Sequence, residues 1–158
     1  MSRPSAYQEG IRLLARHELS VVALRARLLD REHSEGDVEA AIAHLLETGA
    51  LDDRRVARSY ARTAVQVKGR GRLRVQHELH EMGIAKEIAS EALGEVFGDV
   101  DERTLVARAL KKKLQSRPGK PDAGERARLY RYLMHLGFSP DAIRAALKPL
   151  GGGGDSIE

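Results

Sequence analysis

The 158-residue chain contains no cysteine, tryptophan or asparagine, and only 4% of its residues are aromatic. Without cysteine it can form neither disulfides nor thiolate metal sites. It has no run of 18 apolar residues, so we expect no membrane-spanning helix. Residues 1–10 lack the apolar core of a signal peptide. These absences predict a cytoplasmic protein that makes no contact with a membrane.

What the chain does contain favours an all-α fold. It has only five prolines, and its core must be built mainly from Leu, Ala, Val and Ile, which suits close helix packing. Helix-capping residues precede apolar residues at helical spacing, with Ser20, Ser34, Asp52 and Ser139 as expected N-caps. The pattern predicts nine helices. Their expected ranges, where both ends are marked, are residues 5–16, 72–82, 86–96, 102–115, 125–136 and 140–147.

The helix spacing also predicts which side chains face the core. In the first helix we expect Ile11, Leu14 and Ala15 to point inward. In the fourth helix we expect an apolar face that ends at Val67. The opposite face of the fourth helix is cationic, because its four arginines lie at i, i+1, i+4 and i+8.

Two segments concentrate positive charge. Residues 54–77 carry eight Lys or Arg and no acid, and residues 103–120 carry seven bases and no acid. Charge of one sign at this density repels itself unless an anionic partner is present. The net charge of +4 therefore understates the basic character, and nucleic acid or an acidic protein surface is the expected partner.

The helices also repeat. Leu79 to Ile84 matches Leu133 to Phe138, and in each segment a glycine sits where a left-handed residue ends a helix. The same pattern occurs near residue 28, with Glu32 in the place of the glycine. We therefore predict three tandem three-helix repeats in an elongated, curved array: residues 1–50, 51–99 and 100–150, followed by a flexible tail at 151–158.

Several motifs in the middle of the chain resemble one known family. They are Gly49 to Ala57, Lys68-Gly69-Arg70-Gly71, Val75 to Leu79, and Gly83-Ile84. In this order and spacing they resemble RecX, the bacterial regulator of the RecA recombinase, over about residues 9–147. Two positions depart from the pattern. Gly71-Arg72-Leu73 replaces a frequent aromatic and proline, and Ala85 replaces a frequent capping serine.

The resemblance implies an all-α protein that binds the RecA–DNA filament in its groove. It implies inhibition of RecA ATPase, strand exchange and coprotease activities, in control of recombination and the SOS response. It implies no catalysis. We also expect no cofactor and no metal. DNA of either strandedness would be bound weakly and without sequence preference, and we expect a monomer.

The charge distribution, rather than the resemblance, selects the residues expected to contact RecA or DNA. Arginine suits bidentate contacts to phosphate or carboxylate, and the lysine run suits diffuse attraction. The predicted contact set is Arg54, Arg58, Arg62, Lys68, Arg70, Arg72, Arg74, Lys111, Lys112 and Lys113.

Three other functions compete with this interpretation. A helix-turn-helix transcriptional regulator would use the same short glycine turns, but asparagines for base reading and a dimerising heptad seam are missing. A structural helical scaffold would predict a neutral face. An enzyme would need a catalytic set, and none is evident in the chain. His77, His80 and Glu81 lack zinc-protease spacing. The pair Asp52-Asp53 is better explained by helix capping.

Overall fold

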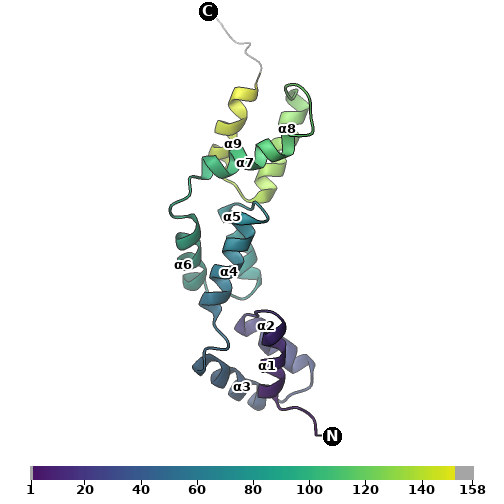
Figure 1. Cartoon of the computed structure of the whole chain (residues 1–158), viewed down its shortest axis with the longest axis vertical. Helices are drawn as coiled ribbons and strands as arrows, with labels where there is room; N and C mark the ends of the chain where they lie inside the picture. The colour runs from purple at the N-terminus through teal and green to yellow at the C-terminus, as the bar shows by residue number, and fades with distance from the viewer. Residues whose placement is uncertain (1, 152–158) are drawn as a thin grey trace, which may run out of the picture. The chain divides into compact units, whose positions relative to one another are not determined.

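The computed structural model describes residues 2–151, and in this range the chain is all-helical, without a β-strand. The element order follows the prediction closely (Figure 1). The predicted tail lies outside the described residues from position 152 onward. The helices are α1 (Ala6–Arg16), α2 (Val21–Asp30), α3 (Glu35–Glu47), α4 (Asp53–Gln66), α5 (Arg72–Glu81), α6 (Lys86–Phe97), α7 (Glu102–Leu114), α8 (Ala123–Leu136), α9 (Pro140–Leu147) and the 3₁₀ helix η1 (Lys148–Leu150).

Contacts divide the chain into two compact units. The first unit comprises Met1–Tyr60 and Glu78–Ala92, and the second comprises Ala61–His77 and Leu93–Glu158. Helices α4, α5 and α6 therefore each contribute to both units. The boundaries of these two units differ from those of the three predicted repeats. The limits of the repeats therefore stay a prediction. None of the helices within residues 2–151 is long and apolar enough to cross a bilayer.

Local capping chemistry explains where most helices begin. Ser20, Ser34 and Ser139 accept a hydrogen bond from the backbone N–H three residues later, as predicted. Asp52 accepts bonds from the first backbone N–H groups of α4, also as predicted. Helix α8 begins at Ala123, two residues earlier than expected, because Asp122 and Glu125 form a capping box.

The core of the first unit lies between α1, α2 and α3, with Leu24, Leu28 and Leu45 fully buried. The predicted inner face of α1 was wrong for two of its three residues, since Ile11 is 39% exposed and Ala15 is also exposed. Leu14 is partly buried and packs against the core, as predicted. The buried residues of α1 are Ala6, Gly10 and Leu13. Gly10 faces α3 closely, because a methyl group there would lie 2.9 Å from Leu45 Cδ1. The lack of a side chain at Gly10 therefore allows this face of α1 to pack against α3.

In the second unit α7, α8 and α9 pack on one another around Val106, Leu133 and Ile143 (Figure 1). Helix α4 ends at Gln66, and Val67 beyond it is 72% exposed. The prediction that the apolar face of α4 extends to Val67 was therefore wrong. The helical spacing of the core residues stops where the helix stops.

Glycine turns dock on helix starts in both units. In the first unit Gly83 (φ 78°) follows α5, and a methyl group there would lie 2.6 Å from Val22 Cβ. Ser20 Oγ donates to the Met82 carbonyl at 2.7 Å beside this contact. The turn after α5 is therefore fixed against the start of α2.

In the second unit the corresponding turn lies between α8 and α9, at Gly137 (φ 98°). The Gly71 N–H donates to Leu136 O at 2.6 Å and the Leu73 N–H donates to Gly137 O at 3.2 Å. A methyl group on Gly71 would lie 2.5 Å from the Gly137 carbonyl. The Gly137 turn docks on the start of α5 as the Gly83 turn docks on α2, so the sequence repeat is also a repeat of contacts.

The third position of the repeat is Glu32, the one non-glycine residue with positive φ (64°) in residues 2–151. It follows α2 with the bonds that close a left-handed helix end, including His33 N–H to Leu28 O. The chain adopts the turn despite the strain of a side chain there. The absence of the capping serine at position 85 has no such consequence, since α6 begins at Lys86 as predicted.

Candidate binding surfaces

The predicted contact residues of α4 differ in what they already bind. Arg54 Nη1 lies 2.5 Å from Glu91 Oε2, an ion pair in which both side chains are more than half exposed. Its neighbour Arg55, outside the predicted set, binds Glu18 and donates to the Gly49 and Ala50 carbonyls. Arg55 therefore joins the segment before α2 to the turn after α3, and sequence spacing alone did not separate its role from that of the other arginines.

Other cations of the predicted set also have contacts inside the chain. Arg74 donates from Nη1 to the His135 carbonyl at 3.1 Å. Arg58, Lys68 and Arg70 each make at least one further interaction within the chain. The side chain of Lys113 lies over the ring of Tyr132, with Nζ 4.6 Å from its centroid. These residues contribute positive charge to the surface, but their side chains already contact other groups of the same chain.

Four residues of the predicted set are exposed and make no hydrogen bond or ion pair within the part of the chain that the structure describes. They all belong to the second unit, where α4 ends, α5 begins and α7 ends. A solvated cation with no internal partner can meet a phosphate or carboxylate without first breaking an existing bond. These four residues are Arg62, Arg72, Lys111 and Lys112.

A groove in the second unit brings together residues that the sequence analysis had treated separately. Its volume is about 120 Å³, and it lies between the end of α4, the segment 67–69, α7 and α8. Lys68 and Lys112 line it, together with Arg108 and Tyr132, which the sequence analysis did not select. Arg108 lies one helical turn before Lys112, and this i, i+4 spacing was the signal that could have found it. We call this the α4–α7–α8 groove.

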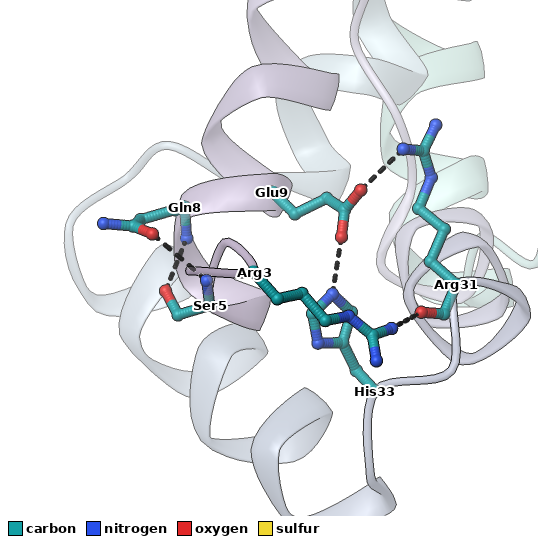
Figure 2. Close-up of polar contacts among 6 residues, drawn as sticks. All are labelled: Arg3, Ser5, Gln8, Glu9, Arg31 and His33. Atoms are coloured by element: carbon teal, nitrogen blue, oxygen red, sulfur yellow. Dashed lines mark hydrogen bonds and ion pairs between the residues drawn. The ribbon is translucent and has the colours of Figure 1, made fainter. Parts of the chain in front are cut away.

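The first unit holds a polar cluster that the sequence analysis did not predict (Figure 2). Glu9 on α1 accepts from His33 Nε2 at 2.5 Å and from Arg31 Nη1 at 2.6 Å. Both the Glu9 and His33 side chains are largely buried, at 13% and 7% exposed. Arg3 donates to the Arg31 carbonyl. The cluster ties the segment before α1 and the turn after α2 to α1.

The electrostatics of this cluster are those of a structural ion pair. The hydrogen bond from His33, and after it that from Arg31, holds the pKa of the Glu9 carboxyl below its ordinary value. An open pocket of about 630 Å³ adjoins His33, and in it Tyr7 and His44 stack with ring centroids 4.4 Å apart. No nucleophile paired with a general base is evident in this pocket, and we assign it no chemistry.

The carboxylate pair Asp52-Asp53 is structural. Asp52 caps its own helix, and Asp53 Oδ1 accepts from the Val21 N–H at 2.9 Å, at the start of α2. Burial raises the pKa of the Asp53 carboxyl, although the bond from Val21 opposes this and nearby Asp52 adds to it. In residues 2–151 no three His, Cys, Asp or Glu side chains are grouped so that they could hold a metal ion.

Comparison with known proteins identifies the repeats. Residues 52–93 match the family model described as RecX, second three-helix domain, and residues 101–147 match the model of the third three-helix domain. The chain is 35% identical to Regulatory protein RecX of Chromohalobacter salexigens over 140 residues, covering 88% of each chain. It is 35% identical to Regulatory protein RecX of Vibrio parahaemolyticus over 143 residues, covering 90% of each.

Solved structures agree on the fold. The crystal structure of RecX from Lactobacillus salivarius superposes with a TM-score of 0.72 at 19% identity, covering 92% of this chain and 94% of that chain. A second crystal structure, of regulatory protein RecX, gives a TM-score of 0.74 at 20% identity over 90% of this chain and 70% of the other. The predicted all-α fold of tandem three-helix repeats is thereby confirmed.

Proposed function

Because the chain belongs to the RecX family of regulatory proteins, we propose that it regulates homologous recombination and the SOS response by binding the RecA–DNA filament. In this proposal it lodges in the filament groove and inhibits RecA ATPase, strand exchange and coprotease activities. It acts in the cytoplasm as a monomer and catalyses no reaction itself. The observation that carries the proposal is the match to RecX proteins over about nine-tenths of the chain.

The charge distribution supports an anionic partner of this kind. A RecA filament presents DNA phosphates and protein carboxylates along one groove, and both attract arginine and lysine. Arg62, Arg72, Lys111 and Lys112 are exposed and unpaired within residues 2–151. We propose these four as the strongest contacts of the predicted set. Arg54 and Arg74 rank lower, because each would first have to release Glu91 or the His135 carbonyl.

Co-sedimentation with RecA filaments tests the proposal directly. RecA assembled on single-stranded DNA with a non-hydrolysable ATP analogue should carry the wild-type protein into the pellet. The Arg62→Glu/Arg72→Glu variant should bind at least about tenfold more weakly, since two charge reversals each change a contact by roughly 1 kcal/mol. Arg12→Glu/Arg16→Glu is the matched control, with the same charge change on exposed residues of α1. Absence of wild-type protein from the pellet would contradict the proposal.

Naked DNA separates this proposal from a helix-turn-helix transcriptional regulator. A regulator of that class prefers one duplex sequence by several kcal/mol. We expect weak binding that is indifferent to sequence. If about six phosphates are contacted, log K should fall with log salt with a slope of about −4 to −5. Strong preference for one duplex sequence would favour the regulator instead.

A further inference from the structure

The α4–α7–α8 groove combines an apolar interior with a cationic rim. Val65, Leu105 and Leu136 contribute apolar walls, and Val67 stands at its edge with 72% of its surface exposed. Arg108 and Lys112 lie along it on α7, and neither makes an ion pair within residues 2–151. No acidic residue lines the groove. The surface therefore offers burial to an apolar group and unneutralised charge to carboxylates beside it.

The size of the groove limits what can enter it. A volume of about 120 Å³ is close to the roughly 150 Å³ of a cavity that accommodates a single benzene molecule. One aliphatic side chain, such as leucine, therefore fits the groove. Val67 at the edge of the groove adds exposed apolar surface that such a side chain would cover.

The residues that line the groove suit a peptide better than a nucleic acid. A nucleic acid would use the cations for phosphates and an aromatic face for base stacking. The groove's aromatic residue is Tyr132, and the Lys113 ammonium already lies over its ring, 4.6 Å from the centroid. The aliphatic walls give a base no π-face to stack on. Charge complementarity together with a one-side-chain hollow favours a polypeptide.

We propose that the α4–α7–α8 groove binds an acidic peptide segment of a protein partner. One aliphatic side chain of the segment enters the groove, and flanking carboxylates contact Arg108 and Lys112. The proposal deepens the proposed function, because it rests on the chain having a protein partner and states the chemistry of one contact. A peptide probe tests it without RecA, so either proposal can fail while the other stands.

The test is an NMR titration of the full-length ¹⁵N-labelled protein with synthetic peptides. The first peptide has one leucine flanked on each side by three acidic residues. The second has serine in place of the leucine. The first should cause saturable amide shifts centred on Val67, Lys68 and Ala109. The serine peptide should bind at least about tenfold more weakly, because it buries no aliphatic side chain.

Two charge variants locate the binding site. Lys112→Glu should weaken binding of the leucine peptide by about three- to tenfold. Arg103→Glu is the matched control, because Arg103 is exposed on the same helix but does not line the groove. It should change the affinity less than twofold.

Three results would overturn the proposal. Equal affinity for the leucine and serine peptides would reduce the groove to a diffuse basic surface. Equal effects of Lys112→Glu and Arg103→Glu would place the binding site elsewhere. Saturable shifts at the groove with a short oligothymidylate, and none with the leucine peptide, would identify a nucleic-acid site instead.

Discussion

The docking of the Gly137 turn on the start of α5 makes Gly71→Ala a sharp test of the fold. The added methyl carbon would lie 2.5 Å from both C and O of Gly137 and 2.8 Å from Phe138 Cδ1. The first two are backbone atoms and cannot rotate away. Relief therefore requires the two backbone segments to separate, which stretches the bonds from the Gly71 and Leu73 N–H groups to the α8 end.

The expected loss of stability follows from the interactions that are weakened when the two backbone segments separate. Two backbone hydrogen bonds are worth about 0.5–1.5 kcal/mol each, and forcing a group into a packed site costs about 1–3 kcal/mol. Replacing glycine returns about 0.4–1 kcal/mol by restricting the unfolded chain. We expect Gly71→Ala to lower the free energy of unfolding by about 3 kcal/mol. Urea denaturation followed by far-UV circular dichroism measures it, and amide exchange at Leu73 should accelerate.

Gly94→Ala is the matched control for this variant. Gly94 lies inside α6, and a methyl group there has no neighbour within 4 Å. The substitution should raise the stability by about 0.5–1 kcal/mol through helix propensity. If Gly71→Ala were instead as stable as the wild type or more so, the close approach of Gly71 to Gly137 would be wrong.

Substitutions at three further positions test local features of the first unit. Glu32→Gly should raise the stability by about 1 kcal/mol by relieving the left-handed residue, whereas Glu32→Ala should not; equal effects in chemical denaturation would contradict this. Glu9→Gln should cost about 1–2 kcal/mol near pH 7. Because the folded-state pKa of Glu9 is lowered, its contribution is complete above the ordinary value of 4.5 and is lost as the pH falls through the folded-state value; a difference from wild type that does not shrink below pH 4.5 would refute the ion-pair assignment. Asp53→Asn keeps the acceptor for the Val21 N–H and should stay within about 0.5 kcal/mol of the wild type, whereas Asp53→Ala should lose about 1 kcal/mol; equal losses in thermal melts would assign the effect to the charge.

Local signals account for the parts of the fold that the sequence predicted well. Helix N-caps act within four residues, so Ser20, Ser34 and Ser139 were found from the sequence alone. The left-handed positions at Gly83 and Gly137 were equally visible, because they recur at one spacing. The start of α8 was predicted two residues too far along the chain. The N-cap, Asp122, lies in a stretch rich in proline and glycine, and it was missed there.

Contacts between distant segments account for what the sequence did not reveal. Gly71 reads as a turn residue, but its close neighbour Gly137 lies 66 positions away in the chain. Arg54 reads as a free cation of a basic face, but Glu91 on another helix neutralises part of it. Asp53 likewise reads as a first-turn acid of α4, but its carboxylate accepts a hydrogen bond from the Val21 N–H at the start of α2. No local pattern encodes these partners, so the predicted contact set could only be ranked once the fold was known.

The single-stranded-DNA-dependent ATPase of the cognate RecA, titrated with this protein, tests the central claim most directly. We predict inhibition at or below one protein per RecA subunit. The Arg62→Glu/Arg72→Glu variant should need about tenfold more protein, and the Arg12→Glu/Arg16→Glu control should match the wild type. Unchanged inhibition by the first variant would retain the function and remove the contact assignment. No inhibition at any ratio by the folded wild-type protein would contradict the regulation of RecA.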